Sequence, residues 1–178
     1  MLFSKTTILS IALFAASACA APTSGVPDTV WRSETKPPEQ VEDDGGFAPR
    51  ASANGVPPDN SLKNHVMPPG GQAQDNDNFV STTADKSVAD KFGKRPYNYE
   101  IDTSVEANQY RNVNEELPGN KFSKQQEFSK QGAIPAPAIN SVEIKDEKGK
   151  VVEKKPMGEP SQPAGTGVYK APPKKGGK

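Results

Sequence analysis

Three short stretches of this 178-residue sequence place polar side chains at or inside apolar strand patterns. Arg32 ends the first stretch, Ser81-Thr82-Thr83 lies within the second, and Gln125-Gln126-Glu127 leads into the third. A guanidinium donates hydrogen bonds in pairs, which suits a phosphate, whereas an amide both donates and accepts and a carboxylate only accepts. Taken singly, each stretch is typical of a solvated strand face or surface charge. Taken in their order and spacing, the three stretches are less well explained in that way.

The elements expected to position these residues are short and separated by turn residues. Period-two alternation and apolar clusters predict strands, and a proline-opened or one-sided apolar run predicts a helix. The expected strands are 28–32, 78–83, 97–101, 125–129 and 141–145, the last paired with 149–153; the expected helices are 37–41, 59–66 and 85–92, and 68–77 is a loop. This pattern favours a small, loop-rich α+β protein.

Composition sets the limits of such a fold. With 33% hydrophobic residues, 18 prolines, 15 glycines and a mean hydropathy of -0.74, disorder is a serious alternative. Residues 21–153 hold 15 basic and 21 acidic residues, a net charge of -6, whereas 154–178 hold six lysines and one glutamate, or +5. We therefore expect one domain over 21–153 and a disordered basic tail over 154–178. An acidic domain does not steer itself onto nucleic acid.

The first twenty residues have the pattern of a secretory signal peptide. Lys5 precedes an apolar run over 8–16, and Ala18-Cys19-Ala20 resembles a cleavage site. The run is too short to span a bilayer as a helix, so the mature protein is expected to be secreted and extracellular. A lipid anchor on Cys19 is the less favoured alternative, because the leucine usual three places earlier is lacking. Cys19 is the only cysteine, so the mature chain is expected to lack disulfides and Cys-ligated metals.

Taken in order, the motifs resemble those of the mono-ADP-ribosyltransferase toxins of the heat-labile enterotoxin and cholera toxin A-chain type. The matching segments are "WRSETKPP" (31–38), "GGFAPR" (45–50), "NSLKNHV" (60–66) with His65, "STT" (81–83), and "QQE" (125–127) before "GAIP" (132–135). Glu34 and Lys36 stand where that family has Asp and Arg, which preserves charge. The resemblance implies a compact α+β fold with a split mixed β-sheet, short helices and long loops.

The resemblance also implies NAD as a substrate and no metal. Glu127 would be the catalytic carboxylate that orients the ribose and offsets the positive charge as the nicotinamide-ribose bond breaks. Arg32 would bind the NAD phosphates, Ser81 would support the catalytic glutamate and the NAD, and His65 would line the ribose side. A single histidine is as often a packed or surface residue.

The acceptor is expected to be read by Gln125 and Phe122. Members that modify arginine carry Glu where this chain has Gln125, whereas scabin- and pierisin-like members, which modify guanine, and Rho-modifying exoenzymes, which modify asparagine, carry Gln. Phe122 resembles the aromatic that abuts the acceptor in those branches, and a core-anchoring role is equally compatible with its position. Gln125 thus belongs with the catalytic set, and guanine is preferred over a protein amide.

The expected function is that of a secreted toxin- or effector-like mono-ADP-ribosyltransferase, acting as a monomer on NAD and a host target, either guanine in nucleic acid or a protein amide. No membrane span is expected. The alternative is a non-enzymatic secreted binding protein on a degenerate or partly disordered scaffold. The low apolar content favours this alternative, and the complete Arg, Ser and Glu set favours the enzyme.

Overall fold

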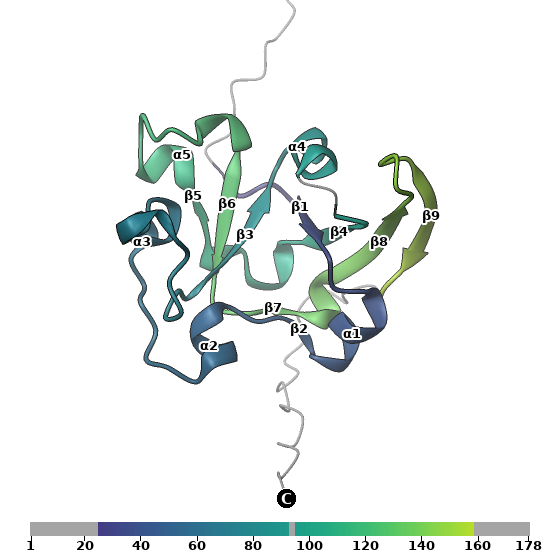
Figure 1. Cartoon of the computed structure of the whole chain (residues 1–178), viewed down its shortest axis with the longest axis horizontal. Coiled ribbons are helices and arrows are strands. Elements are labelled where there is room, and N and C mark those ends of the chain that lie inside the picture. The colour runs from purple at the N-terminus through teal and green to yellow at the C-terminus, as the bar shows by residue number, and fades with distance from the viewer. Residues whose placement is uncertain (1–24, 93–94, 159–178) are drawn as a thin grey trace, which may run out of the picture.

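The structure, a computed structural model, describes residues 25–92 and 95–158. Short strands and helices alternate along this part of the chain (Figure 1). The strands are β1 (Thr29–Glu34), β2 (Gly46–Phe47), β3 (Phe79–Thr83), β4 (Tyr97–Asp102), β5 (Tyr110–Asn112), β6 (Glu127–Gln131), β7 (Ile134–Pro135), β8 (Ile139–Lys145) and β9 (Val151–Pro156). The α-helices are α1 (Pro38–Asp43), α2 (Arg50–Asn54), α3 (Leu62–Val66), α4 (Lys86–Lys91) and α5 (Val113–Glu116), and the 3-10 helices are η1 (Pro69–Gly71), η2 (Ser104–Gln109), η3 (Ser123–Gln125) and η4 (Ala136–Ala138). The α+β class is confirmed.

Seven strands form one sheet in the order β5-β6-β3-β1-β4-β8-β9, and β2 pairs with β7 in a separate two-stranded sheet. Every pair of named strands among the described residues is antiparallel. The prediction of a mixed sheet is therefore wrong: the described sheets are antiparallel. Figure 1 shows β2, β7, α1 and α2 together below the large sheet.

The large sheet is split between its central strands β1 and β3. β1 pairs with β4 along its whole length, but it meets β3 only at Trp31, opposite Thr83. Continuing that register by two residues would bring Ser33 opposite Ser81, yet the strands have separated by then. This separation opens the sheet next to Arg32, residues 81–83 and residues 125–127, the three polar stretches singled out in the sequence.

Two apolar clusters hold the sheet in place. The first lies under β1, β4 and β8, and the second joins α3 to β3 and α5. The buried members of the first cluster are Val30, Val41, Phe47, Val80, Tyr99, Ile101, Tyr110, Phe128, Ile134, Ala138, Ile139, Val142 and Met157; those of the second are Leu62, Val66, Phe79 and Val113. The described chain therefore has a real core despite its low apolar content, which argues against the disordered alternative for this part.

The small sheet depends on a glycine that the sequence motif also contains. Gly46 in β2 lies opposite Pro135 in β7 with φ at 117°, a conformation that L side chains rarely adopt. A Cβ placed on Gly46 would lie 2.0 Å from the carbonyl oxygen of Ile134. Only glycine fits this close approach of two backbones.

For two of the elements that begin later than expected, the structure shows the cause. The helix expected over 59–66 is α3 alone, because the Ser61 side chain accepts a hydrogen bond from the backbone N–H of Asn64 and so caps the helix there. The strand expected over 125–129 begins at Glu127, because Gln126 adopts a left-handed conformation with φ at 45° and ends η3. The sequence pattern does not predict β2, β5, β7, α2 or α5.

The predicted hairpin of β8 and β9 is present, but it continues beyond the expected end of the domain. Lys154 lies in β9 and forms an ion pair with Glu100 at 2.7 Å, and Met157 is 4% exposed in the first apolar cluster. The boundary predicted before Lys154 is therefore wrong: the fold extends at least to Met157. The expected signal peptide (1–20) and the rest of the expected tail (159–178) lie outside the described residues.

Candidate active site

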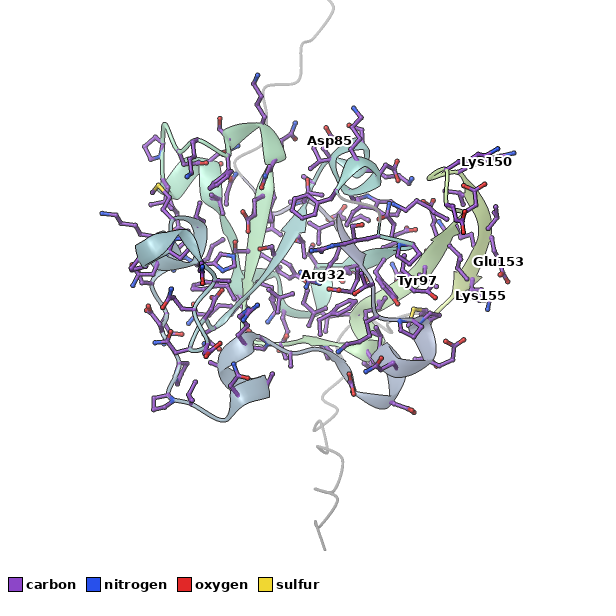
Figure 2. All side chains as sticks on the ribbon, viewed as in Figure 1. Arg32, Asp85, Tyr97, Lys150, Glu153 and Lys155 are labelled. Atoms are coloured by element: carbon purple, nitrogen blue, oxygen red, sulfur yellow. The ribbon has the colours of Figure 1, made fainter. Side chains whose placement is uncertain are left out.

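The separation of β1 and β3 creates a cleft of about 240 Å³. Four of the residues predicted from the sequence line it: Arg32, Ser81, Gln125 and Glu127. Arg32, labelled in Figure 2, lies near the middle of the view, whereas Lys150, Glu153 and Lys155 lie at the β9 edge of the sheet. The cleft is thus at the centre of the large sheet, away from the β8-β9 hairpin.

Arginine side chains bind the backbone carbonyls at the point where the strands separate. Arg32 donates from Nη1 to the Ser81 carbonyl at 2.8 Å, and Arg95 donates from Nη1 to the Ser33 carbonyl at 2.8 Å. Ser33 and Ser81 are the two residues that a continued β1-β3 ladder would have placed opposite each other. The guanidinium groups therefore supply hydrogen bonds that the ladder does not, and they bring two cations to the mouth of the cleft.

Arg32 is held by several contacts at once. Its Nη2 donates to Glu34 Oε2 at 2.8 Å, and its guanidinium carbon lies 5.2 Å from the centre of the Phe47 ring. Burial alone would raise the pKa of Glu34, but the charges of Arg32 and Arg95 and the hydrogen bonds from Arg32 and the Thr35 backbone together outweigh it and hold that pKa below its usual value. Glu34, which replaces the family's Asp, therefore serves as the ionised partner of Arg32.

Glu127 begins β6 opposite Thr83 of β3. Its Oε1 accepts hydrogen bonds from Ser129 Oγ at 2.9 Å and interacts with His65 Nε2 at 3.1 Å. Burial would raise the pKa of Glu127, but the hydrogen bonds from His65, Ser81 and Ser129 and the charge of His65 together outweigh it, so the net shift is downward and the carboxylate is ionised. Because a carboxylate offers about four acceptor sites, Glu127 keeps capacity for a ligand hydroxyl.

His65 lies between two carboxylates and the Ser81 hydroxyl. Its Nδ1 is 2.7 Å from Asp77 Oδ2, and its Nε2 is 3.0 Å from Ser81 Oγ in addition to the contact with Glu127. Burial would lower the pKa of His65, but the hydrogen bonds to Asp77 and Glu127 raise it to about 9. His65 is therefore an imidazolium at neutral pH, and it contacts both Glu127, the predicted catalytic residue, and Ser81, the serine predicted to support it.

Gln125 is positioned by the end of β3. Thr83 Oγ1 donates to the Gln125 carbonyl at 2.7 Å, and the Ala84 backbone N–H donates to the Gln126 carbonyl at 3.1 Å. The left-handed Gln126 turns the chain sharply between Gln125 and Glu127. These bonds tie the Gln-x-Glu segment to the Ser-Thr-Thr strand, so the two motifs share one rigid unit.

Phe122 lies elsewhere. It is half-buried against the second apolar cluster, and Lys121 Nζ lies 4.9 Å from the centre of its ring. It is not among the residues that line the cleft. This packing gives Phe122 the core-anchoring role that the sequence left open, and its predicted contact with an acceptor stays a prediction.

α4 and the residue that follows it contribute apolar side chains to the cleft. Val88, Ala89 and Phe92, the apolar face predicted for this helix, line the cleft together with Trp31. Phe92 is 44% exposed, and the Arg95 guanidinium carbon lies 5.2 Å from its ring centre. The cleft is thus lined by apolar side chains together with a few polar and charged groups, which is common in small-molecule sites.

Sequence reasoning missed Asp77, Ser129 and Arg95. Asp77 was part of an expected loop, and twelve residues separate it from His65, so no local spacing links the two. Ser129 could have been found, since alternation along a strand places it on the same face as Glu127 two residues earlier. Arg95 follows a helix by a few residues, and nothing in the sequence distinguishes it from a surface cation.

Two further observations concern the part of the chain that the structure describes. No group of three His, Cys, Asp or Glu side chains is arranged to hold a metal ion there. Nor does any helix in residues 25–92 or 95–158 have the length and apolarity needed to cross a membrane.

Comparisons with solved structures show the same architecture. A guanine-specific ADP-ribosyltransferase matches with a TM-score of 0.61 at 21% sequence identity, over 77% of this chain and 79% of that chain. The scabin toxin from Streptomyces scabies in complex with NADH matches with a TM-score of 0.61 at 22% identity, over 89% of this chain and 100% of that chain. A single-residue variant of scabin matches at 25% identity with a TM-score of 0.61, over 75% and 78% of the two chains. The fold is that of the ADP-ribosyltransferases.

The family follows from the sequence itself. A family model described as Scabin-like matches residues 30–157. The chain therefore belongs to the Scabin-like family, which confirms the predicted resemblance. No curated protein sequence matches the chain.

Proposed function

We propose that this protein is a secreted, toxin-like mono-ADP-ribosyltransferase that uses NAD as its donor and guanine as its acceptor. The observation that carries the proposal is the convergence of Arg32, Ser81 and an ionised Glu127 on one cleft in a Scabin-like chain. A solved relative binds NADH, and another structural neighbour is described as guanine-specific.

The cleft fits part of a dinucleotide. Its volume of about 240 Å³ is below the roughly 300–1,000 Å³ of pockets that enclose a drug-sized ligand. The reacting end would therefore lie inside and the remainder outside. Arg32 donates one hydrogen bond from Nη1 and one from Nη2, while its buried Nε has no hydrogen-bond partner within the described residues. A guanidinium has five N–H donors, so each Nη group keeps one further N–H that a phosphate could accept.

The chain's own residues account for the chemistry of the donor. The bond between nicotinamide and ribose breaks with its electron pair leaving on nicotinamide, and a nitrogen of the acceptor then bonds to the ribose carbon and loses its proton. Glu127 would accept a hydrogen bond from a ribose hydroxyl and offset the positive charge that develops on the sugar. Ser129 and His65 hold that carboxylate by one oxygen, so its orientation is fixed before the donor binds.

Gln125 supports a neutral acceptor. Its amide can donate and accept toward a nucleobase edge, whereas a carboxylate would favour a cationic arginine. The net charge of -6 over residues 21–153 opposes strong binding of a polyanion, so engagement of DNA is expected to be weak and salt-sensitive. Secretion rests on the signal-peptide pattern of residues 1–20, and a monomeric state and a host target belong to the same proposal.

The test is the release of nicotinamide from NAD by the purified protein, without and with an acceptor. Glu127→Gln should lower turnover at least ~100-fold, as expected for a preorganised electrostatic group, while NAD affinity stays nearly unchanged. Arg32→Lys should instead weaken NAD binding, because the lysine ammonium is a point charge and lacks the paired N–H donors with which a guanidinium binds a phosphate. Wild-type turnover in Glu127→Gln would contradict the catalytic assignment.

The acceptor is tested with labelled NAD offered with guanosine, DNA, agmatine or a host lysate. Labelling of guanosine or DNA is expected. Efficient labelling of agmatine alone would exclude guanine, and a single labelled protein band would indicate a protein amide. NAD binding without any turnover would favour the non-enzymatic alternative.

A further inference from the structure

Asp77 is a buried carboxylate that the proposed chemistry does not use directly. It lies two residues before β3, and its side chain is 12% exposed. Its Oδ1 accepts from the backbone N–H of Phe79 at 3.0 Å, which leaves Oδ2 directed at His65 Nδ1 at 2.7 Å. The carboxylate is therefore fixed through one oxygen to the strand that carries Ser81 and through the other to the histidine.

His65 is correspondingly enclosed by negative charge on two sides. Asp77 faces Nδ1 from the chain before β3, and Glu127 faces Nε2 from β6. The Phe79 ring packs on the imidazole, with ring centres 5.2 Å apart. Three other charged groups contact the neighbours of His65. The Arg111 guanidinium carbon lies 5.7 Å from the centre of the Phe79 ring, and Arg32 acts electrostatically on Glu127. Asp59 accepts a hydrogen bond from the side chain of Asn64, which precedes His65 in α3.

Only a doubly protonated ring can donate to both carboxylates. A neutral imidazole has one N–H and one lone pair, so it would direct the lone pair at Asp77 or at Glu127. Because both contacts are short and both partners are nearly buried, loss of a proton would set up a repulsive contact with one of them. The geometry therefore favours a carboxylate-imidazolium-carboxylate chain from Asp77 through His65 to Glu127.

We propose that Asp77 is a positioning residue, which keeps His65 doubly protonated and directs its Nε2–H to the carboxylate of Glu127. Its consequence for catalysis rests on the proposed function, in which Glu127 binds the ribose of NAD. Asp77 does not touch the substrate. It acts by giving Glu127 a charged hydrogen-bond donor, which is about twice as strong as a neutral one.

The first test needs no enzymatic activity. His65 is the only histidine in the chain, so the untagged full-length protein has a single imidazole signal to follow by NMR as the pH is changed. The wild-type ring is expected to titrate near 9. Asp77→Asn keeps the shape and the acceptor for the Phe79 N–H but removes the charge, so its His65 pKa should fall toward the ordinary value of about 6.5. An unchanged His65 titration in Asp77→Asn would overturn the proposal.

The second test is the pH dependence of NAD hydrolysis. Below about pH 6, His65 is an imidazolium in both the wild type and Asp77→Asn, so their rates of NAD hydrolysis should be nearly equal. At pH 8 the wild type should be about tenfold faster, because only its His65 remains mostly charged. The loss is expected in kcat, with KM for NAD little changed. A rate ratio that stays constant with pH would indicate a merely structural role for Asp77 and overturn the proposal.

Asp75→Asn is the matched control. Asp75 lies on the same loop, and its side chain is 80% exposed and forms a long ion pair with Arg50 at 3.6 Å. Asp75→Asn should match the wild type both in the His65 titration and in the pH dependence of NAD hydrolysis. If it changes either by as much as Asp77→Asn does, the proposed role is not specific to Asp77. If the wild type fails to hydrolyse NAD at any pH, the proposed function fails, while the NMR titration still decides whether Asp77 holds the His65 proton.

Discussion

The hydroxyl of Thr83 is expected to control transfer to an acceptor more than hydrolysis of NAD. Thr83 is 7% exposed, donates to the Gln125 carbonyl at 2.7 Å, and accepts from the Asp85 backbone N–H at 3.0 Å. Thr83→Val keeps the branched shape and removes both hydrogen bonds. Gln125 then loses the bond that fixes its backbone to β3, whereas Glu127 keeps its ladder position and its contacts with Ser129 and His65.

The size of the effect follows from these contacts. Leaving a partly buried donor or acceptor unpaired costs about 1–3 kcal/mol, which corresponds to a fall of roughly 4–12 °C in melting temperature for a domain of this size. A displacement of Gln125 by about 1 Å is expected to reduce transfer about tenfold, within the range that small misplacements cause. Hydrolysis of NAD to water should change by less than about twofold, because water needs no positioning by Gln125.

Thr82→Val provides the control for this prediction. Thr82 is the neighbouring residue of β3, is 4% exposed, and donates to the carbonyl of Phe128, the residue opposite it in β6. Its variant should lose similar stability without changing the ratio of transfer to hydrolysis. The assay measures both products from one labelled NAD sample, alongside thermal unfolding. If Thr82→Val and Thr83→Val change the ratio equally, the reasoning that ties Gln125 to β3 is refuted.

Two predictions concern stability. Gly46→Ala should destabilise the fold by roughly 3 kcal/mol or more, because of backbone strain and because the new Cβ would lie 2.0 Å from the Ile134 carbonyl oxygen. The control is Gly55→Ala, since Gly55 also has a positive φ but nothing within 4 Å of the new Cβ, and it should cost only about 1 kcal/mol. Equal denaturation midpoints of the two variants would refute the packing argument. Because the pKa of His65 is raised from 6.5 to about 9 in the fold, its stabilisation is complete below about pH 6.5 and is lost as the pH rises through 9. The free energy of unfolding by urea should therefore fall by about 3 kcal/mol between pH 6 and pH 9 from this group, and His65→Phe should lack that fall.

The motif residues could be predicted because each belongs to an element with a clear local pattern. Arg32 ends a run of alternating residues, and the Ser-Thr-Thr stretch continues one, so their strands follow from period-two alternation. The pairing of these strands did not follow from either pattern. The resemblance to a toxin family implied that the motif residues act in one site, and Arg32, Ser81, Gln125 and Glu127 all line the cleft between β1 and β3.

Other features depend on contacts that no local pattern contains. Asp77 reaches His65 only because the loop before β3 returns to α3, so its role needed the tertiary structure. The strand was expected to include Gln125 because Gln-x-Glu resembles an alternating run, and the left-handed Gln126 breaks that run. Likewise, Lys154 and Met157 stand in a Pro- and Lys-rich context, yet one pairs with Glu100 and the other packs in the core.

Arg32 links the architecture of the cleft to its chemistry. A sheet that separates at its centre leaves backbone carbonyls without ladder partners, and burying such groups unpaired is costly. Arg32 supplies a donor to the Ser81 carbonyl, while Glu34 keeps the guanidinium ionised and fixed in direction. The same group presents its remaining donors to the cleft, so the contact that allows the sheet to open also creates the positive charge that an NAD phosphate requires. Loss of Arg32 should therefore weaken the β1-β3 junction and ligand binding together, whereas loss of Glu127 should leave the junction intact.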